Sequence, residues 1–238
     1  MLKLLNTMYI SCIILAAGKG SRFDRNNDKL LIRLAKKKLL SYSIGTFQRH
    51  PQINEIIVVA SRKNKSQIQH LVKKEGFTKV KRIVLGGKRR QDSVAEGVKV
   101  TSPHTEIVII HDGARPFVEE SLVTKLIKKV RFWGAAILAV PVKETIKQIE
   151  INTVNHEMLV EKTLKRDTLW QVQTPQAFHK RLIEEAIAKF VKEDVTDDAS
   201  LVEKIGLPVA VVLGSYENIK VTTAEDALIA QALAKRKA

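Results

Sequence analysis

The stretch at residues 10–20, ISCIILAAGKG, decides the fold. Residues 10–15 are apolar and rich in β-branched isoleucine, which is the composition of a strand buried on both faces. The run leads directly into the glycine-rich turn AAGKG at residues 16–20. Backbone N–H groups in such a turn have no bulky side chains in front of them, which suits a phosphate chain. The stretch therefore predicts a buried first strand that ends at a site for an anion.

This turn matches neither of the two common phosphate-binding motifs. Phe23 stands where a dinucleotide-binding fingerprint has its third glycine. A Walker loop would need glycine at Ile13 and Ser or Thr at Gly20. Arg22 and Lys29 follow the turn and would add positive charge to a phosphate site. The alternative is a tight turn with surface cations, so the turn alone does not establish a nucleotide site.

Beyond the turn, short β-branched runs alternate with stretches of helical periodicity. Strands are predicted over residues 10–15, 55–60, 81–85, 106–110, 135–140 and 208–213. Helices are predicted over residues 39–48, 65–75, 92–100, 119–132, 181–192, 199–204 and 224–235. Gly76 and Gly134 stand at C-terminal cap positions, and Thr222-x-x-Glu225 predicts a capping box for the last helix. The repeated βα pattern predicts an α/β fold, a mainly parallel sheet with helices on both faces.

Residues 140–170 interrupt this alternation. Two extended stretches, at 142–151 and 158–164, flank a polar turn at 152–155. Neither stretch has enough apolar residues for its own core, and an isolated two-stranded hairpin is marginal in water. We therefore expect residues 1–238 to form one domain, with residues 141–168 as a projecting β-arm that docks on a second subunit. A floppy excursion is the alternative.

The composition excludes several classes of protein. A chain of 238 residues that is 45% hydrophobic and 28% charged has enough core for a globular enzyme and is not disordered. Its longest apolar run, at residues 10–17, is shorter than the roughly 20 residues that cross a bilayer, so no membrane partner is expected. That run loosely resembles a secretory signal, but it is short and leads straight into a turn. The single Cys12 cannot form an intramolecular disulfide, and we expect a cytoplasmic location.

The net charge of +16 attracts polyanions of any kind. A basic nucleic-acid-binding protein is therefore one alternative. Only 5% of the residues are aromatic, and no helix-turn-helix, zinc or RNP pattern is recognisable. We expect no nucleic-acid partner and favour phosphorylated small molecules.

Two further strand ends carry candidate site residues, because ligands of α/β sheets bind where strands end. Gly86 clears space after the strand at 81–85, and Ser93 either caps a helix or contacts a base or ribose. Asp112 follows a very apolar strand, with Arg115 three residues later. A carboxylate placed there requires a cation, either Arg115 or a hard divalent metal such as Mg²⁺. We favour the metal, with Arg115 facing an anionic substrate.

Seven motifs in order resemble the 2-C-methyl-D-erythritol 4-phosphate cytidylyltransferase family, along nearly the whole chain. They are LAAGKGSR…DK, the turn GG…DS at residues 86–93, IHDGARP, PVKETIK, RDTLWQVQTPQAF, TDDAS and ENIKVTT. The resemblance implies a Rossmann-like nucleotide-diphospho-sugar transferase fold, a homodimer joined through the arm, and dependence on Mg²⁺ or another divalent cation. It also implies that CMP passes from CTP to 2-C-methyl-D-erythritol 4-phosphate, with release of pyrophosphate.

The resemblance further implies roles for individual residues. Those that would stabilise charge during catalysis are Arg22 and Lys29. Those that would bind CTP are Ala16, Ala17, Gly18, Gly86, Ser93 and Asp112, with the metal at Asp112. Those that would bind the acceptor are Arg115, Thr196 and Lys220, with Thr145 and Arg166 reaching over from the partner subunit. One departure is that Asp28 and Leu30 flank Lys29, where the family usually has Pro and Gln.

The chemistry of this reaction agrees with the residues present. A phosphate monoester is largely a dianion near neutral pH, so it can attack phosphorus without a general base. The six scattered histidines are therefore not required as bases. The alternatives are a ribitol-5-phosphate cytidylyltransferase, whose first turn tends to read Ala-Gly-Gly, and a nucleotidyltransferase that uses GTP or UTP.

Overall fold

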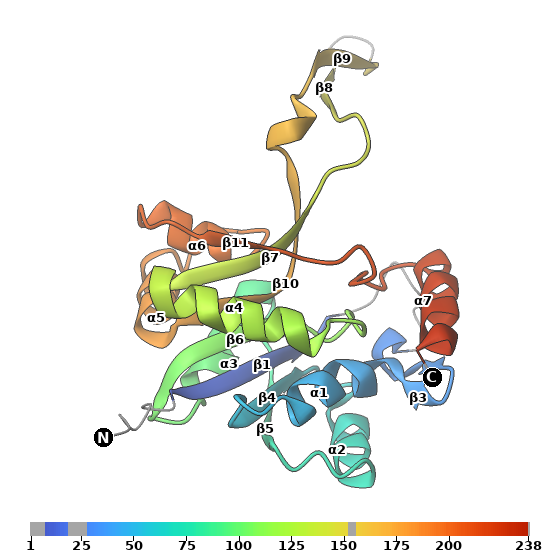
Figure 1. Cartoon of the computed structure of the whole chain (residues 1–238), viewed down its shortest axis with the longest axis vertical. Helices are drawn as coiled ribbons and strands as arrows, with labels where there is room; N and C mark the ends of the chain where they lie inside the picture. Colours follow the sequence, from blue (N-terminus) through green and yellow to red (C-terminus); the bar gives the residue numbers. More distant parts are fainter. Residues whose placement is uncertain (1–7, 19–27, 152–155, 238) are drawn as a thin grey trace.

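The computed structural model describes residues 8–18, 28–151 and 156–237. Its described part contains a central seven-stranded sheet in the order β11-β7-β10-β6-β1-β4-β5 (Figure 1). The strands of this sheet are β1 (Tyr9–Ala16), β4 (Glu55–Ala60), β5 (Val80–Leu85), β6 (Thr105–Asp112), β7 (Ala135–Pro141), β10 (Trp170–His179) and β11 (Ala210–Leu213). The short strands outside it are β2 (Arg33–Leu34), β3 (Lys37–Lys38), β8 (Lys147–Ile151) and β9 (Met158–Thr163).

Helices cover both faces of the sheet, as the alternating pattern predicts. They are α1 (Leu39–Arg49), α2 (Lys65–Lys74), α3 (Arg90–Lys99), α4 (Glu120–Trp133), α5 (Lys180–Lys189), α6 (Ala199–Lys204) and α7 (Ala224–Arg236). Two 3₁₀ turns are η1 (Lys29–Leu31) and η2 (Arg166–Thr168). All six predicted strands and all seven predicted helices are present, with ends that shift by up to three residues.

The sheet is mainly parallel, and β10 is its exception. β10 lies between β6 and β7 and runs antiparallel to both. The sequence analysis did not predict this strand, because the stretch is rich in glutamine and contains Pro175, which disfavours a central strand. The register shift between Gln173 and Gln176 lets Thr174 and Pro175 leave the ladder.

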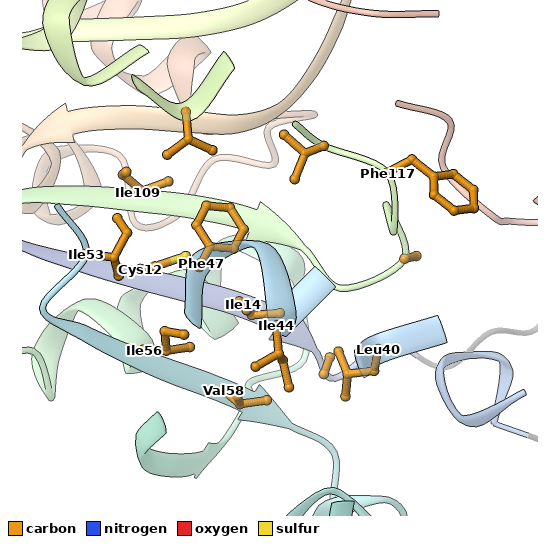
Figure 2. Close-up of a cluster of buried hydrophobic side chains, with 14 of the residues drawn as sticks. Cys12, Ile14, Leu40, Ile44, Phe47, Ile53, Ile56, Val58, Ile109 and Phe117 are labelled. Atoms are coloured by element: carbon orange, nitrogen blue, oxygen red, sulfur yellow. The ribbon is translucent and has the colours of Figure 1, made fainter. Parts of the chain in front are cut away.

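Each face of the sheet has its own hydrophobic core, because successive side chains of a strand point to opposite faces. Cys12 and Ile14 of β1 pack into the core under α1 and α4, where Phe47 is fully buried (Figure 2). Ile13 points to the other core, under α3, α5 and α6. Among the described residues, no helix has both the length and the apolar character that a bilayer crossing needs.

The helix ends confirm two expectations and correct two others. Gly134 ends α4 in the left-handed conformation with φ 77°, and Gly76 follows α2 with φ 66°. The capping box of α7 is formed by Thr223 with Asp226, so the predicted pair of Thr222 and Glu225 is wrong by one residue. The expectation that Ser93 caps a helix is also wrong, because α3 begins at Arg90 with Arg89 as its N-cap.

The arm is a hairpin of β8 and β9 that stands away from the sheet (Figure 1). The predicted turn at residues 152–155 lies outside the described residues. Every residue of both strands is exposed, including Met158 at 77% and Val160 at 58%. The chain by itself therefore leaves an apolar hairpin uncovered, and its docking on a second subunit stays a prediction.

Candidate active site

A cavity of about 910 Å³ lies where β1, β5 and β6 end. This is the edge at which open α/β sheets bind their ligands, and the volume suits a small molecule of nucleotide size. The cavity is lined by Leu15, Ala17, Gly18, Lys29, Leu30, Gly86, Gly87, Lys88, Arg89, Arg90, Ser93, Asp112, Ala114, Lys220 and Thr222. Most of the residues expected to bind the nucleotide thus lie together.

Close packing at Gly86 forms one wall of this cavity. A Cβ atom on Gly86 would lie 2.6 Å from Ser93 Oγ and 2.7 Å from Ala17 Cβ, so only glycine fits. The Ser93 hydroxyl donates to the Arg89 carbonyl at 3.2 Å inside the first turn of α3. Ala16 is fully buried at the end of β1, and its carbonyl accepts a hydrogen bond from Asn64. Gly18 leaves the backbone beside the cavity unobstructed.

Lys29 and its neighbours form a defined turn despite the unusual sequence. The Asp28 carboxylate caps η1 by accepting from the Leu30 N–H at 2.9 Å, and it also accepts from Asn64 Nδ2. Leu30 is buried, and Lys29 Nζ donates to the Val221 carbonyl at 3.0 Å. Asp28 and Leu30 thus give this loop a cap and an apolar anchor, and Lys29 lines the cavity.

The Asp112 carboxylate lies at the centre of a cluster of cations. Its oxygens are 2.7 Å from Lys220 Nζ, 3.6 Å from Arg90 Nε and 3.9 Å from Arg115 Nε. Arg90 also makes two hydrogen bonds of 2.8 Å to Asp198, which is fully buried. Three cations therefore face two carboxylates, which leaves surplus positive charge for an anionic ligand.

This cluster controls the ionisation of its members. Burial alone would raise the pKa of Asp112, but Lys220, Arg90 and Arg115 outweigh it and hold that pKa well below its ordinary value. Burial lowers the pKa of Arg115, against the attraction of Asp112. Of the two alternatives for Asp112, the structure shows pairing with cations. The expected partner Arg115 is the most distant of the three.

A second cavity of about 410 Å³ adjoins the first. Arg90, Asp112 and Lys220 line both cavities, so the two share a wall. Arg115 and Thr196 line the second one. The structure thus brings together the three acceptor residues that were expected from the main body of the chain.

The arm residues do not reach this site within one chain. Thr145 and Arg166 are exposed on the arm, and neither lines a described cavity. Arg166 Nη1 donates to the Lys143 carbonyl at 2.9 Å, which holds the base of the arm. Arg22 lies outside the described residues.

Three residues of the site are absent from the sequence-based candidates: Arg90, His111 and Thr174. Arg90 could have been found from the paired aspartates of TDDAS, since a buried carboxylate requires a cation. His111 is fully buried, and burial lowers its pKa to about 4. Its Nε2 lies 3.0 Å from the Arg115 carbonyl, and its Nδ1 lies 3.2 Å from Thr174 Oγ1. No local pattern marks the contact with Thr174, because it joins distant parts of the chain.

The donor set limits the kind of metal that could bind. Within residues 8–18, 28–151 and 156–237, no three His, Cys, Asp or Glu side chains cluster as metal ligands. Asp112 is the acidic residue of the larger cavity in this part of the chain. Mg²⁺ in nucleotide sites is commonly held by one or two carboxylates together with substrate phosphates and water. Asp112 fits that role and does not form an all-protein metal site.

A mainly parallel α/β sheet with two joined, cation-lined cavities at its carboxyl edge has the architecture of a nucleotidyltransferase. A family model described as 2-C-methyl-D-erythritol 4-phosphate cytidylyltransferase matches residues 10–236. The chain belongs to this family.

Individual relatives carry the same name. One from Alkaliphilus metalliredigens (strain QYMF) is 43% identical over 227 residues, 94% of this chain and 92% of the relative. One from Syntrophus aciditrophicus (strain SB) is 41% identical over 230 residues, 95% of this chain and 96% of the relative. The crystal structure of 4-diphosphocytidyl-2C-methyl-D-erythritol synthase from Anaerococcus prevotii DSM 20548 has a TM-score of 0.84 at 34% identity, covering 99% of this chain and 100% of that one. The crystal structure of the enzyme from Thermus thermophilus has a TM-score of 0.76 at 28% identity, covering 96% and 100%.

Burial of His111 makes stability depend on pH. The imidazole has a pKa of about 4 in the folded chain, against about 6.5 when unfolded. Between these values the unfolded chain binds a proton that the folded chain does not, so stability falls as the pH decreases. We expect urea unfolding to show a loss of about 3 kcal/mol from His111 between pH 7 and pH 4.

The variant His111→Gln is the control, since it has no group that titrates in this range. The difference between the two pH profiles isolates His111 from His50, whose pKa burial also lowers. Asp112 acts in a different part of the pH range, because its contribution is lost only as the pH falls through and below the ordinary carboxyl range. Parallel profiles for the wild type and the variant would contradict the prediction.

Proposed function

We propose that this protein transfers CMP from CTP to 2-C-methyl-D-erythritol 4-phosphate, giving 4-diphosphocytidyl-2-C-methyl-D-erythritol and pyrophosphate. The observation that carries the proposal is the pair of adjoining cavities, which share Arg90, Asp112 and Lys220. Two anionic substrates in neighbouring cavities would meet at this shared wall. Membership of the family supports the identities of the nucleotide and the acceptor. The reduced and buried Cys12 is compatible with the cytoplasmic location that we propose.

The larger cavity would hold CTP. The glycine wall at Gly86 and the Ser93 hydroxyl suit a flat base and a ribose, while the backbone after β1 and Lys29 suit the phosphates. The smaller cavity would hold the acceptor, whose phosphate would face Arg115 and Lys220. This arrangement would put the acceptor phosphate beside the α-phosphate of CTP.

The chemical step needs positioning and charge neutralisation more than proton transfer. An oxygen of the acceptor phosphate forms a bond to the α-phosphorus, while the bond from that phosphorus to the bridging oxygen of the β-phosphate breaks. The electron pair leaves with pyrophosphate. We assign to Arg22 and Lys29 the stabilisation of the charge that develops on the transferred and leaving groups. The dianionic acceptor needs no base, which agrees with His111 being buried and engaged in hydrogen bonds.

Asp112 would hold the Mg²⁺ or other divalent cation, together with phosphate oxygens of CTP. The ion would neutralise phosphate charge when bound. In the described chain the Asp112 carboxylate contacts Lys220, so binding of an anion and a cation would exchange these partners. Lys220 would then be available to the substrate phosphates.

We further propose that the arm forms a homodimer. Its exposed apolar residues favour burial against a second copy, and Thr145 and Arg166 line neither cavity of their own chain. In the dimer each arm would supply these two residues to the acceptor cavity of the partner.

The test of the function is pyrophosphate release from CTP and Mg²⁺ with different acceptors. We expect release with 2-C-methyl-D-erythritol 4-phosphate, and none with D-ribitol 5-phosphate or when UTP or GTP replaces CTP. Release with ribitol phosphate alone would keep the nucleotide site but overturn the acceptor. If neither acceptor supports release, the function is wrong, and binding of the basic surface to nucleic acid becomes the next measurement.

Lys29 is expected to act in the transition state. Lys29→Ala should lower kcat by about 100-fold while KM for CTP changes by less than about threefold, because the charge that it neutralises develops during the reaction. Steady-state kinetics at saturating acceptor measure both constants. Lys99→Ala, which removes an exposed lysine of α3, is the matched control and should leave both unchanged. An equal loss in both constants would reduce Lys29 to a contact that only docks CTP.

The arm is expected to control association. Val160→Asp puts a charge on the apolar hairpin and should weaken the dimer by about tenfold or more, as measured by analytical ultracentrifugation over a range of concentrations. Val191→Asp is the control, since Val191 is exposed to a similar degree, 55% against 58%, but lies away from the arm. Activity should fall together with the dimer, because Arg166 would reach the site only across subunits. A Val160→Asp protein that remains fully dimeric would refute this role of the arm.

A further inference from the structure

We infer that His111 and Thr174 are positioning residues: a buried relay of hydrogen bonds through their side chains holds the turn that presents Asp112 and Arg115. The relay begins at the N–H of Asp112, which donates to Thr174 Oγ1 at 3.0 Å. Thr174 Oγ1 lies 3.2 Å from His111 Nδ1, and His111 Nε2 lies 3.0 Å from the Arg115 carbonyl. The relay therefore joins the backbone at both ends of the turn. Neither side chain is proposed to touch a substrate.

The position of every proton in the relay follows from its two ends. The Arg115 carbonyl can only accept, so His111 Nε2 must carry a hydrogen and donate it. The Asp112 N–H can only donate, so Thr174 Oγ1 accepts there and has its own hydrogen free for His111 Nδ1. His111 is thus the neutral tautomer with its hydrogen on Nε2. The hydroxyl of Thr174 is the one group in this arrangement that both accepts and donates through a single atom.

The need for the relay comes from the bulge in β10. The ladder between β10 and β6 begins at the pair Gln176 and Ile110, so His111 and Asp112 have no main-chain partner on this side. On their other side both residues pair with β1. The Thr174 side chain replaces the missing ladder bond, because an unpaired buried N–H at Asp112 would be costly.

The surroundings of the relay favour a single geometry. His111 is fully buried, Thr174 is 5% exposed, and the ring of Phe47 lies 5.1 Å from the imidazole ring. Hydrogen bonds in such a dry environment are stronger than in water, and a lost partner cannot be replaced by solvent. The carbonyl of Thr174 also accepts from Asn218 Nδ2 at 2.9 Å. The carbonyl of Asn218 in turn accepts from the Arg115 guanidinium at 2.8 Å.

The bulge therefore holds both ends of the Arg115 residue. Its backbone carbonyl is reached through His111, and its guanidinium is reached through Asn218. Lys220 lies two residues beyond Asn218 and contacts Asp112. The charged groups shared by the two cavities are thus oriented from one short segment of β10.

The first test is spectroscopic and does not depend on the proposed function. Imidazole ¹⁵N NMR of the wild type should show His111 with a protonated Nε2 and an unprotonated Nδ1, and loss of the signal in His111→Gln assigns it. Thr174→Ser keeps the hydroxyl and should leave the Nδ1 shift in place. Thr174→Val removes the hydroxyl at nearly equal volume and should move that shift toward the value of a nitrogen without a hydrogen bond. An unchanged Nδ1 shift in Thr174→Val would overturn the relay.

The second test is kinetic and rests on the proposed function. Thr174→Val should lower kcat by about tenfold, with KM for CTP within about twofold, because the wall at Gly86 and Ser93 is untouched. Thr174→Ser should retain kcat within about twofold. His111→Gln keeps a donor toward Arg115 but removes the acceptor for Thr174, so it should reproduce the Thr174→Val pattern and serves if that variant fails to fold.

The two tests separate the possible failures. Equal losses in Thr174→Ser and Thr174→Val, or a rise in KM for CTP without a fall in kcat, would make the residues structural only and overturn the inference. If the wild type releases no pyrophosphate with either acceptor, the proposed function fails, while the NMR result still decides whether the relay exists.

Discussion

Neutralisation of the buried carboxylate of Asp112 is the constraint on which the rest of this site depends. A charge at the end of an apolar strand must be met by cations, and here Lys220, Arg90 and Arg115 come from three separate parts of the chain. Their convergence fixes the loop after β5, the turn after β6 and the segment before α7 against one another. The same surplus of cations leaves the site ready for anions. Stability of the fold and affinity for phosphates therefore have a common electrostatic origin.

The antiparallel strand β10 gives the molecule its second organising feature. The chain leaves the sheet at Pro141, forms the arm, and returns as β10 between β6 and β7. One strand thus connects the arm to the turn that carries Asp112. The bulge at Thr174 and Pro175 costs two ladder positions, and the freed Thr174 side chain takes over the hydrogen bonding that the ladder gives up. The irregularity in the sheet and the order in the site are two results of the same local geometry.

Much of the site could be read from local sequence, and the part that could not has a clear physical cause. Glycines at Gly18 and Gly86, and the acid and base of the IHDGARP motif, stand at strand ends, where α/β folds bind ligands. The grouping of Gly18, Gly86 and Asp112 in one cavity confirms that reasoning. Arg115 is a more distant partner of Asp112 than Lys220. The roles of His111 and Thr174 were invisible because they depend on a contact between residues 63 positions apart in the sequence.

The sequence by itself determined the alternation of strands and helices, the glycine-rich turn after the first strand, and the exposed character of the arm. Each of these depends on periodicity or on backbone freedom within a few residues. Only the tertiary structure decided that a glutamine-rich stretch with Pro175 would become a central antiparallel strand, and which cation would lie nearest to Asp112. Pairing between strands and pairing between charges depend on which distant segments meet. Local propensity is too weak to specify that choice, because burial and hydrogen bonding across the whole sheet determine it.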